Sequence, residues 1–599
     1  MEPADSRLEG SAQSIRHIIR RSGAILKCSY TVYLTRPPEN LDNMTTLNLV
    51  DWTVVGLYFL VLLIVVIAVT RKQQNTTDYF LAGRNVGFFA IGASIFASNI
   101  GSEHVVGLAG QGASTGLAMA HYELHAWIVV LLAWIFVPFY YESKVFTMPE
   151  FLERRFGPKP RWMLSLVSLA AYVLTKVSVT VYAGAVVFST LLPNTFGSPQ
   201  NAFWVGAIAT VVLTGLYTVA GGLRAVLYTD SVQAVILIIG SAAVTWFGLE
   251  RLGGWGELRE FTSQNVAQYA LWRPLSDPDF PWLGILIASP IVGIWYWCTD
   301  QYIVQRTLAA RDLKTARRGA LFGAFLKVTP VMIFLIPGLI GAALYARGLI
   351  AIPLTSAGGL AGDQVFPIMV TTLLPEGLRG LVVAALMAAL MSSLSSLFNS
   401  TATLFTVDIY EKLRPAASQL HLVTVGRLVT VVVVLLGLAW IPIMPLISEG
   451  GLYQYLQNVQ GYLAPPITAV FLLGLFSSRI NTHGAVWGLG LGFVLGMSKL
   501  VIQALFGEGK IESPALLAAI GDFNFLYFSG VLFLICVVTI VVASWTDAAP
   551  DRERIRGLTY DSIDRAAVRA SWDRRDVAAT AVVLGLVAAL YLYFSFWVG

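Results

Sequence analysis

Long runs of apolar residues, divided by short polar stretches, fill the chain from about residue 47 to its end. A helix needs roughly 20 apolar residues to cross the hydrocarbon core of a bilayer. By this measure the pattern predicts about fourteen membrane-spanning helices. They are expected at 47–70, 84–110, 116–141, 162–192, 202–220, 226–249, 281–304, 319–346, 366–406, 421–446, 453–477, 482–506, 523–545 and 577–597. We therefore predict one all-α polytopic domain over 44–599, with a long polar loop at about 546–576 before the last helix.

The composition supports this reading. Of the 599 residues, 56% are hydrophobic and 13% are charged, whereas an ordinary soluble chain has about 25% charged residues. Lipid must therefore be the solvent for most of the surface, and we expect a multi-pass protein of the plasma or inner membrane. The three cysteines lie far apart with no zinc-type spacing. The net charge of +5 is ordinary for basic cytoplasmic loops, and no nucleic-acid partner is expected.

The first 43 residues differ from the rest, because they are basic and only weakly apolar. They lack the uninterrupted apolar core of a secretory signal peptide. One interpretation is an arm that lies on the membrane surface. The favoured interpretation is a disordered or non-native tail, with Met44 beginning the working protein.

Loop charges predict the orientation, because cytoplasmic loops of membrane proteins collect Lys and Arg. Basic clusters lie at 144–161, 306–318, 412–414 and 552–575, and each follows an odd-numbered predicted span. We therefore place these loops in the cytoplasm and both ends of the domain outside. The basic tail would then lie on the disfavoured side, which also supports Met44 as the start.

Ionisable side chains at bilayer depth are the first indication of function, because each costs about 2.5–3.5 kcal/mol to insert. Gln457 and Gln460 are uncharged but also costly to bury without partners. The ionisable residues within predicted spans are Glu103, His104, His121, Glu123, His125, Asp230, Asp300 and Lys327.

The stretch SNIGSEHVVGLAG at 98–110 places several of these groups among glycines. Glycines alone could serve close helix pairing. That explanation leaves out Asn99 and His104, which stand beside the glycines. A discontinuous helix accounts for both, because unwound carbonyls can coordinate a cation while side chains at the break face a substrate. We therefore predict a broken helix here.

The ninth predicted span carries an unusual density of small polar residues, namely Ser392, Ser393, Ser395, Ser396, Asn399 and Ser400. Isolated serines in a membrane helix can bond to carbonyls of the preceding turn. Six such residues exceed that need. Hydroxyl and carbonyl oxygens suit a hard cation such as Na⁺.

Tyr296 and Trp297, in the stretch IWYWCTDQYIVQR, lie too deep in their span for an interfacial aromatic belt. Aromatic faces at this depth suit stacking on the C–H face of a sugar or on a cation. Together with nearby amide, imidazole and charged groups, they favour a neutral polyhydroxylated solute.

Six stretches closely resemble the sodium/glucose cotransporter family of sodium:solute symporters. They are DYFLAGRNVGFFAIGASIFASNIGSEHVVGLAG, FTMPEFLERRFG, LYTVAGGLRAVLYTDSVQ, WYWCTDQYIVQR, LMSSLSSLFNSTATLFTVDIY and YLQNVQGYLAPPITAVFLLGLF. The resemblance runs from about Leu47 to Trp545. It implies a LeuT-type fold of two inverted five-helix repeats and sodium-coupled uptake by alternating access. The single last helix after a short loop favours a bacterial member, and a monomer is expected to suffice for transport.

The resemblance also implies a set of site residues. The sodium site would use the carbonyls of Ala97, Ile100 and Ala389 and the hydroxyls of Ser392 and Ser393. The substrate site would use Asn99, His104, Glu123, Lys327 and Gln457, with Tyr296 as inner gate and with Trp297, Tyr453 and Gln460 beside it. Asp230 and Ser395 are candidates for a second sodium or for ion coupling.

Two departures leave the solute open. Gly293 stands where hexose-carrying relatives often have Thr or Asn, and Gln460 replaces a Thr. We expect glucose or galactose, with inositol or another polyol as the alternative and a solute such as proline or pantothenate behind it. An enzyme is not expected, because neither HExxH nor a complete GxSxG lies within a predicted span. A channel would show repeated pore loops.

Overall fold

The computed structural model describes residues 47–70, 73–193, 195–355, 358–442, 452–506 and 514–598. The predicted tail at 1–43 and Met44 lie outside the described residues. Over the described ranges the chain is helical apart from turns and three isolated bridges. Twelve helices within these ranges are long and apolar enough to cross a membrane.

The predicted number of about fourteen spans is therefore not confirmed, and the division of the long helices explains the difference. The element α12 (Pro199–Leu252) runs for 54 residues and covers two predicted spans, with a break in helical geometry at Gly222. Gly222 has φ 56°, and a Cβ there would overlap the carbonyl oxygen of Tyr79. Only glycine combines this positive φ with so close an approach to Tyr79, so the helical geometry breaks at this point without a polar loop. In addition, α4 (Phe88–Asn99) is apolar but short.

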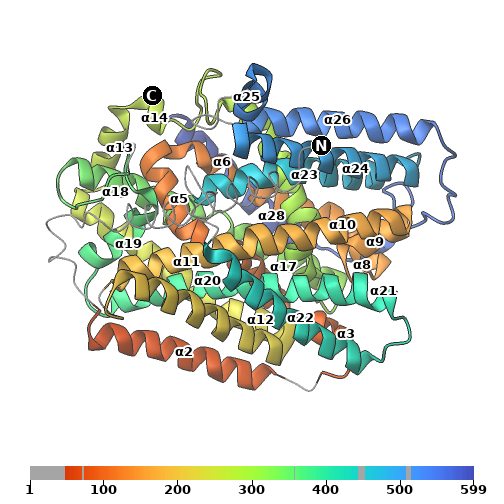
Figure 1. Ribbon diagram of the computed structural model, residues 1–599, viewed down its shortest axis with the longest axis horizontal. Helices are drawn as coiled ribbons and strands as arrows, with labels where there is room; N and C mark the ends of the chain where they lie inside the picture. The colour runs from red at the N-terminus through yellow and green to blue at the C-terminus, as the bar shows by residue number, and fades with distance from the viewer. Residues whose placement is uncertain are drawn as a thin grey trace, which may run out of the picture.

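The helices divide into an exposed apolar set and a buried set. Figure 1 shows α2 (Leu49–Val69) along one edge of the molecule, with α24 (Thr482–Phe506) and α26 (Phe525–Trp545) at the opposite edge. Their exposed faces carry Leu, Ile, Val and Trp side chains, as expected of surfaces in contact with lipid. By contrast, α20 (Leu378–Thr403) is almost wholly buried, and it packs against α12 and α4.

Besides the break at Gly222, two further breaks in the described part of the chain lie deep in the bundle. The first break separates α4 from α5 (Ser102–Thr115), where Ile100 and Gly101 have extended backbone. This confirms the broken helix predicted at 98–110. The second break lies at Asp300, between the π-helical turn η6 (Trp295–Thr299) and α16 (Gln301–Leu308). The Asp300 carboxylate caps α16 by accepting a hydrogen bond from the Tyr302 backbone N–H at 3.2 Å.

The other elements complete the bundle and its connections. Before α12 they are α3 (Thr76–Phe80), η2 (Ala82–Arg84), η3 (Gly116–Met119), α6 (Ala120–Glu123), α7 (Ala126–Leu131), η4 (Leu132–Phe136), α8 (Val137–Ser143), α9 (Met148–Phe156), α10 (Pro158–Ala171), η5 (Tyr172–Val177) and α11 (Ser178–Leu191). After it come α13 (Trp255–Ser263), α14 (Val266–Tyr269), α15 (Trp282–Ile294), α17 (Leu313–Leu326), η7 (Val331–Leu335), α18 (Ile336–Ala346), α19 (Gly362–Leu373), η8 (Leu404–Tyr410), α21 (Glu411–Leu413), α22 (Gln419–Trp440), α23 (Leu452–Phe476), α25 (Ala515–Asp522), α27 (Arg565–Ala570) and α28 (Arg574–Ser595).

The last helix, α28, is fastened at its start by an exposed charge cluster. Asp573 caps the helix and forms ion pairs of 2.9 Å with Lys314 and Arg318 near the start of α17. The hydrogen bond from Lys314, followed by that from the Arg575 backbone N–H, lowers the pKa of Asp573 from 3.8 to about 2. Asp573 is therefore charged at neutral pH, and its contacts join α28 to the bundle.

Candidate binding sites at the helix breaks

A cavity of about 340 Å³ lies where the first helix break meets α6, α15, η6, α17 and α23. The residues that line it are Asn99, His104, Tyr122, Glu123, His125, Val292, Gly293, Tyr296, Trp297, Lys327, Gln457 and Gln460. The structure thus brings together eight of the nine side chains predicted to contact substrate. The ninth, Tyr453, has a side chain that lies outside the described residues.

Glu123 and Lys327 form an ion pair in the wall of the cavity. The Lys327 Nζ lies 2.6 Å from the Glu123 Oε2, and their side chains are only 2% and 1% exposed. The ammonium also lies 5.4 Å from the centre of the Trp297 ring, a cation–π contact. Because the two opposite charges cancel, this pair adds no net charge to the cavity.

Several polar atoms of the cavity residues lack hydrogen-bond partners in the described part of the chain. They are the Asn99 Nδ2, the Tyr122 hydroxyl and the Gln457 Oε1, and all three are buried. Leaving a polar atom unsatisfied in a protein interior costs about 1–3 kcal/mol. These atoms offer both donors and acceptors to a molecule in the cavity, as hydroxyl groups require.

The aromatic residues lie on the turn that leads to the second break. The rings of Tyr296 and Trp297 pack edge to face, with centroids 5.0 Å apart. Both belong to η6, and π-helical turns recur at functional sites. Tyr296 is half-buried while Trp297 is 1% exposed, so Tyr296 has the greater freedom to contact a ligand.

A second buried ion pair adjoins Tyr296 and was not predicted. The Lys176 Nζ lies 2.6 Å from the Asp300 Oδ2, and the Tyr172 hydroxyl donates to the Asp300 Oδ1. The same Nζ lies 4.7–5.1 Å from the ring centres of four aromatic residues, which are Tyr172, Trp295, Tyr296 and Tyr302. This cluster joins η5 to the second helix break.

The predicted sodium ligands also converge. The Ser392 hydroxyl donates to the carbonyl of Ala97 at 2.8 Å and to that of Ala389 at 3.0 Å. The Ser393 hydroxyl donates to the Ser98 carbonyl at 3.1 Å. The hydroxyls of α20 therefore face the carbonyls at the first break, next to Ile100.

Asp230 lies beside this group of oxygens. Its Oδ2 accepts hydrogen bonds from the hydroxyls of Ser94 at 2.5 Å and Ser98 at 3.3 Å. The Ser98 hydroxyl is in turn 2.8 Å from that of Ser396 on α20. The Ser395 hydroxyl donates to the Ser392 carbonyl at 3.0 Å, so the candidate residues for a second ion adjoin the first group.

Sequence reasoning missed Tyr122, and it noted His125 without assigning it a role. The two residues are three apart on either side of Glu123, and their ring centres lie 5.5 Å apart. Both flank an intramembrane carboxylate within the predicted span 116–141, and this position was the available signal.

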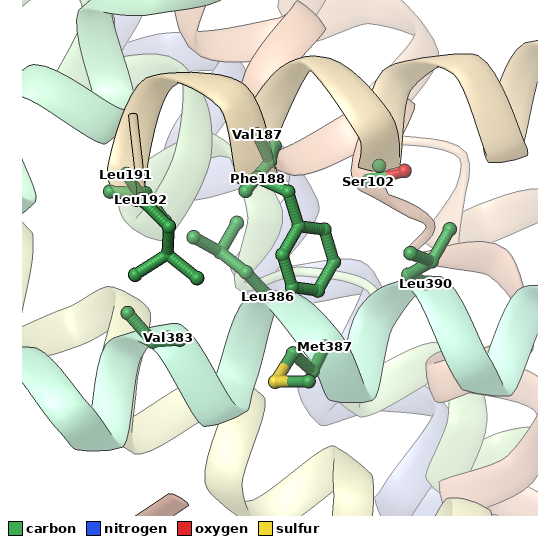
Figure 2. Close-up of a pocket in the computed structure, with 10 residues that line it drawn as sticks. Ser102, Val187, Phe188, Leu191, Leu192, Val383, Leu386, Met387 and Leu390 are labelled. Carbon is green, nitrogen blue, oxygen red and sulfur yellow. The ribbon is translucent and has the colours of Figure 1, made fainter. Parts of the chain in front are cut away.

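A different cavity, of about 300 Å³, lies between α11 and α20 and has apolar walls. In Figure 2, Phe188 of α11 and Leu386 and Met387 of α20 occupy the space between the two helices, and Ser102 lies at one side. Because this lining is almost entirely hydrocarbon, the cavity offers little to a polar solute.

Comparison with known proteins identifies the family. A sequence profile of the sodium:solute symporter family matches residues 79–492. This chain belongs to that family. It is 39% identical over 553 residues to sodium/glucose cotransporter 1 of Oryctolagus cuniculus, which covers 87% of this chain and 82% of the relative. It is also 39% identical over 541 residues to sodium/myo-inositol cotransporter 2 of Sus scrofa, covering 86% and 79% of the two chains.

A solved structure of a Na⁺-coupled sialic acid symporter, in a substrate-bound outward-open state, matches with a TM-score of 0.70 at 23% identity. The match covers 84% of this chain and 99% of that one. This likeness confirms the LeuT-type fold. The protein is thus a sodium-coupled solute symporter rather than an enzyme, and sodium is its co-transported ion. It is a multi-pass membrane protein, and the plasma membrane is the usual location for this family.

Proposed function

We propose that this symporter carries a neutral polyhydroxylated solute, with glucose or galactose favoured and myo-inositol as the alternative. The main support is the cavity, whose wall holds both the self-neutralising Glu123–Lys327 pair and the Tyr296 ring. The two relatives named for glucose and for myo-inositol are equally similar to this chain, so they do not separate the two solutes.

A charged solute fits this cavity less well. A carboxylate or a quaternary ammonium group would need a counter-ion of its own. In this cavity the acidic and basic groups are committed to each other at 2.6 Å. Hydroxyl groups can instead share both partners, since the carboxylate accepts and the ammonium donates. The cavity therefore disfavours proline-like and pantothenate-like solutes.

The coupling of sodium to the solute follows from the first break. We assign sodium to the oxygens of Ala97, Ile100, Ala389, Ser392 and Ser393, with Asp230 and Ser395 available to a second ion. Ala97 and Asn99 are two residues apart, yet one faces the serines of α20 and the other the cavity. Ion binding would order the break and thereby position Asn99 for the solute. The solute would then bind more tightly when sodium is bound than when it is absent, which is what coupling requires.

The second break supplies an inner gate in this proposal. Lys176 and Asp300 hold η5 against the start of α16, and Tyr296 packs on the same ammonium. Opening the cavity on this side would require the ion pair to separate. All of these groups come from one chain, so a monomer suffices.

The test is uptake by proteoliposomes that contain the purified protein under an imposed inward sodium gradient. Labelled glucose is competed with galactose, myo-inositol, proline and pantothenate in separate reactions. We expect hexoses or inositol to compete and the charged solutes not to. Competition by proline alone, or equal uptake of labelled sugar by empty liposomes, would overturn the proposal.

A further inference from the structure

His125 is a buried histidine in the cavity wall for which the proposed mechanism has no use. It stands at the junction of α6 and α7 and is 4% exposed. Its Nε2 lies 2.6 Å from the hydroxyl of Ser289 on α15. Ser289 is four residues before Gly293, so both lie on the face of α15 that meets the imidazole.

Gly293 explains how the imidazole reaches this position. A Cβ added to Gly293 would lie 3.0 Å from both the Cε1 and the Nδ1 of His125, and it would overlap the Cδ1 of Ile128. A side chain at position 293 would therefore first displace the end of Ile128 and would then press on the imidazole. A histidine at 125 and a side chain at 293 compete for the same space in this packing.

The chemistry of the ring then determines what it offers to the cavity. A neutral imidazole has one donor and one acceptor nitrogen, and a serine hydroxyl can complement either. The Nε2 of His125 is engaged by Ser289, so its other nitrogen, Nδ1, is the one nearest to Gly293. His125 and Gly293 both line the cavity. Whichever role Nδ1 takes, a hydroxyl group of a solute can complement it.

We propose that His125 is a substrate-contacting residue that sets which polyhydroxylated solute this symporter accepts. Its Nδ1 binds the solute hydroxyl that a side chain at position 293 would otherwise reach, and Ser289 is the positioning residue that holds the ring. This inference rests on the proposed function, since it requires a hydroxylated solute.

The first experiment measures uptake kinetics for His125→Ala with parent sugars and with analogues that each lack one hydroxyl. Loss of one hydrogen bond should raise KM roughly threefold to tenfold. The wild type should discriminate against one deoxy analogue in particular, and His125→Ala should lose that discrimination. The sodium concentration for half-maximal uptake should stay within about twofold. Ser289→Ala, which keeps the ring, should give a smaller rise in KM for the same analogue series.

The second experiment uses the competition for space between His125 and a side chain introduced at position 293. Gly293→Thr alone should lower uptake severely, because the new side chain collides with the imidazole and with Ile128. The variant His125→Ala/Ile128→Val/Gly293→Thr, which also removes the overlapping Cδ1 of Ile128, should recover part of the uptake, with a changed order of preference among hexoses and inositol. Failure of this triple variant to exceed Ile128→Val/Gly293→Thr would contradict the competition between His125 and a side chain at 293.

His121→Gln is the matched control. His121 is also a buried histidine of this segment, but its ring nitrogens lie 3.1 Å from the Leu271 carbonyl and 3.3 Å from the Tyr591 hydroxyl, and it does not line the cavity. The KM values of His121→Gln should match those of the wild type for every analogue.

The outcomes separate the two proposals. Absence of any sodium-dependent polyol uptake by the wild type would overturn the proposed function. Normal wild-type uptake together with unchanged KM values for every analogue in His125→Ala would overturn only the role of His125. Should His125→Ala fail to reach the membrane, the analogue series with Ser289→Ala decides, and an unchanged series contradicts the inference.

Discussion

Replacing Glu123 with Gln leaves the Lys327 ammonium as a buried charge that has lost its ion-pair partner. The two groups lie 2.6 Å apart with side chains 1% and 2% exposed, so water screens the pair little. Two unit charges about 4 Å apart attract by about 4 kcal/mol at an effective dielectric constant near 20. Breaking a buried pair by removing one partner typically costs about 3–5 kcal/mol. We expect a loss of stability of this order in Glu123→Gln.

The double variant Glu123→Gln/Lys327→Gln separates stability from transport. It buries no unpaired charge, so most of the lost stability should return. Uptake should nevertheless stay low in both variants, because the charged hydrogen-bonding groups of the cavity are gone. Thermal unfolding in detergent, followed by tryptophan fluorescence, and proteoliposome uptake give the two readouts.

A surface ion pair supplies the control. Glu257 lies 2.5 Å from Arg347, but their side chains are 42% and 38% exposed. Pairs exposed to this degree contribute about 0–1 kcal/mol, so Glu257→Gln should unfold near the wild-type temperature. Unfolding and transport like those of the wild type in Glu123→Gln would refute the expected cost of the unpaired charge. A double variant no more stable than the single one would refute it as well.

Four further predictions follow from the same geometry. Ser392→Ala/Ser393→Ala should raise the sodium concentration for half-maximal uptake about thirtyfold, at roughly 1 kcal/mol for each lost hydroxyl. The sugar KM should change little at saturating sodium, and a sodium titration of uptake checks this. Gln457→Ala should lower uptake about tenfold at equal membrane expression, since the amide contacts the solute. Lys176→Met should loosen α16, seen as faster hydrogen exchange there, and unchanged exchange would count against the inner gate. Because the pKa of Asp573 is lowered to about 2, its anchoring of α28 is complete above about pH 4 and is lost as the pH falls through about 2. Asp573→Asn should therefore speed hydrogen exchange at the start of α28 at pH 7.

The first helix break was predictable because local chemistry marks it. Glycines and polar residues interrupt an apolar run at 98–110, and extended backbone occurs there at Ile100 and Gly101. The serine face of α20 was predictable for a similar reason. The convergence of these two segments came from family resemblance, since nothing in either segment specifies its neighbour.

The second break had no such local mark. No glycine occurs between Ile294 and Ile303, and the partner of Asp300 is Lys176, a residue 124 positions away in the chain. An ion pair of this kind depends on tertiary packing. The close approach of His125 to Gly293 could not be predicted for the same reason. The imidazole lies in space that a glycine leaves open on a different helix.

The predicted number of about fourteen spans is not confirmed by the twelve membrane-length helices of the described residues. Composition placed two apolar segments, at 202–220 and 226–249, where the structure has one element. Gly222 lies inside one continuous element of 54 residues, and its positive φ appears only in the folded chain.

The central claim is that the ion and the solute share the first helix break, so that each strengthens the binding of the other. The most direct measurement is the dissociation constant of the purified protein for its solute, in sodium and in choline at equal ionic strength. We predict that sodium tightens solute binding about tenfold or more, and that the solute tightens sodium binding by the same factor. Equal solute affinity in sodium and in choline would contradict the account.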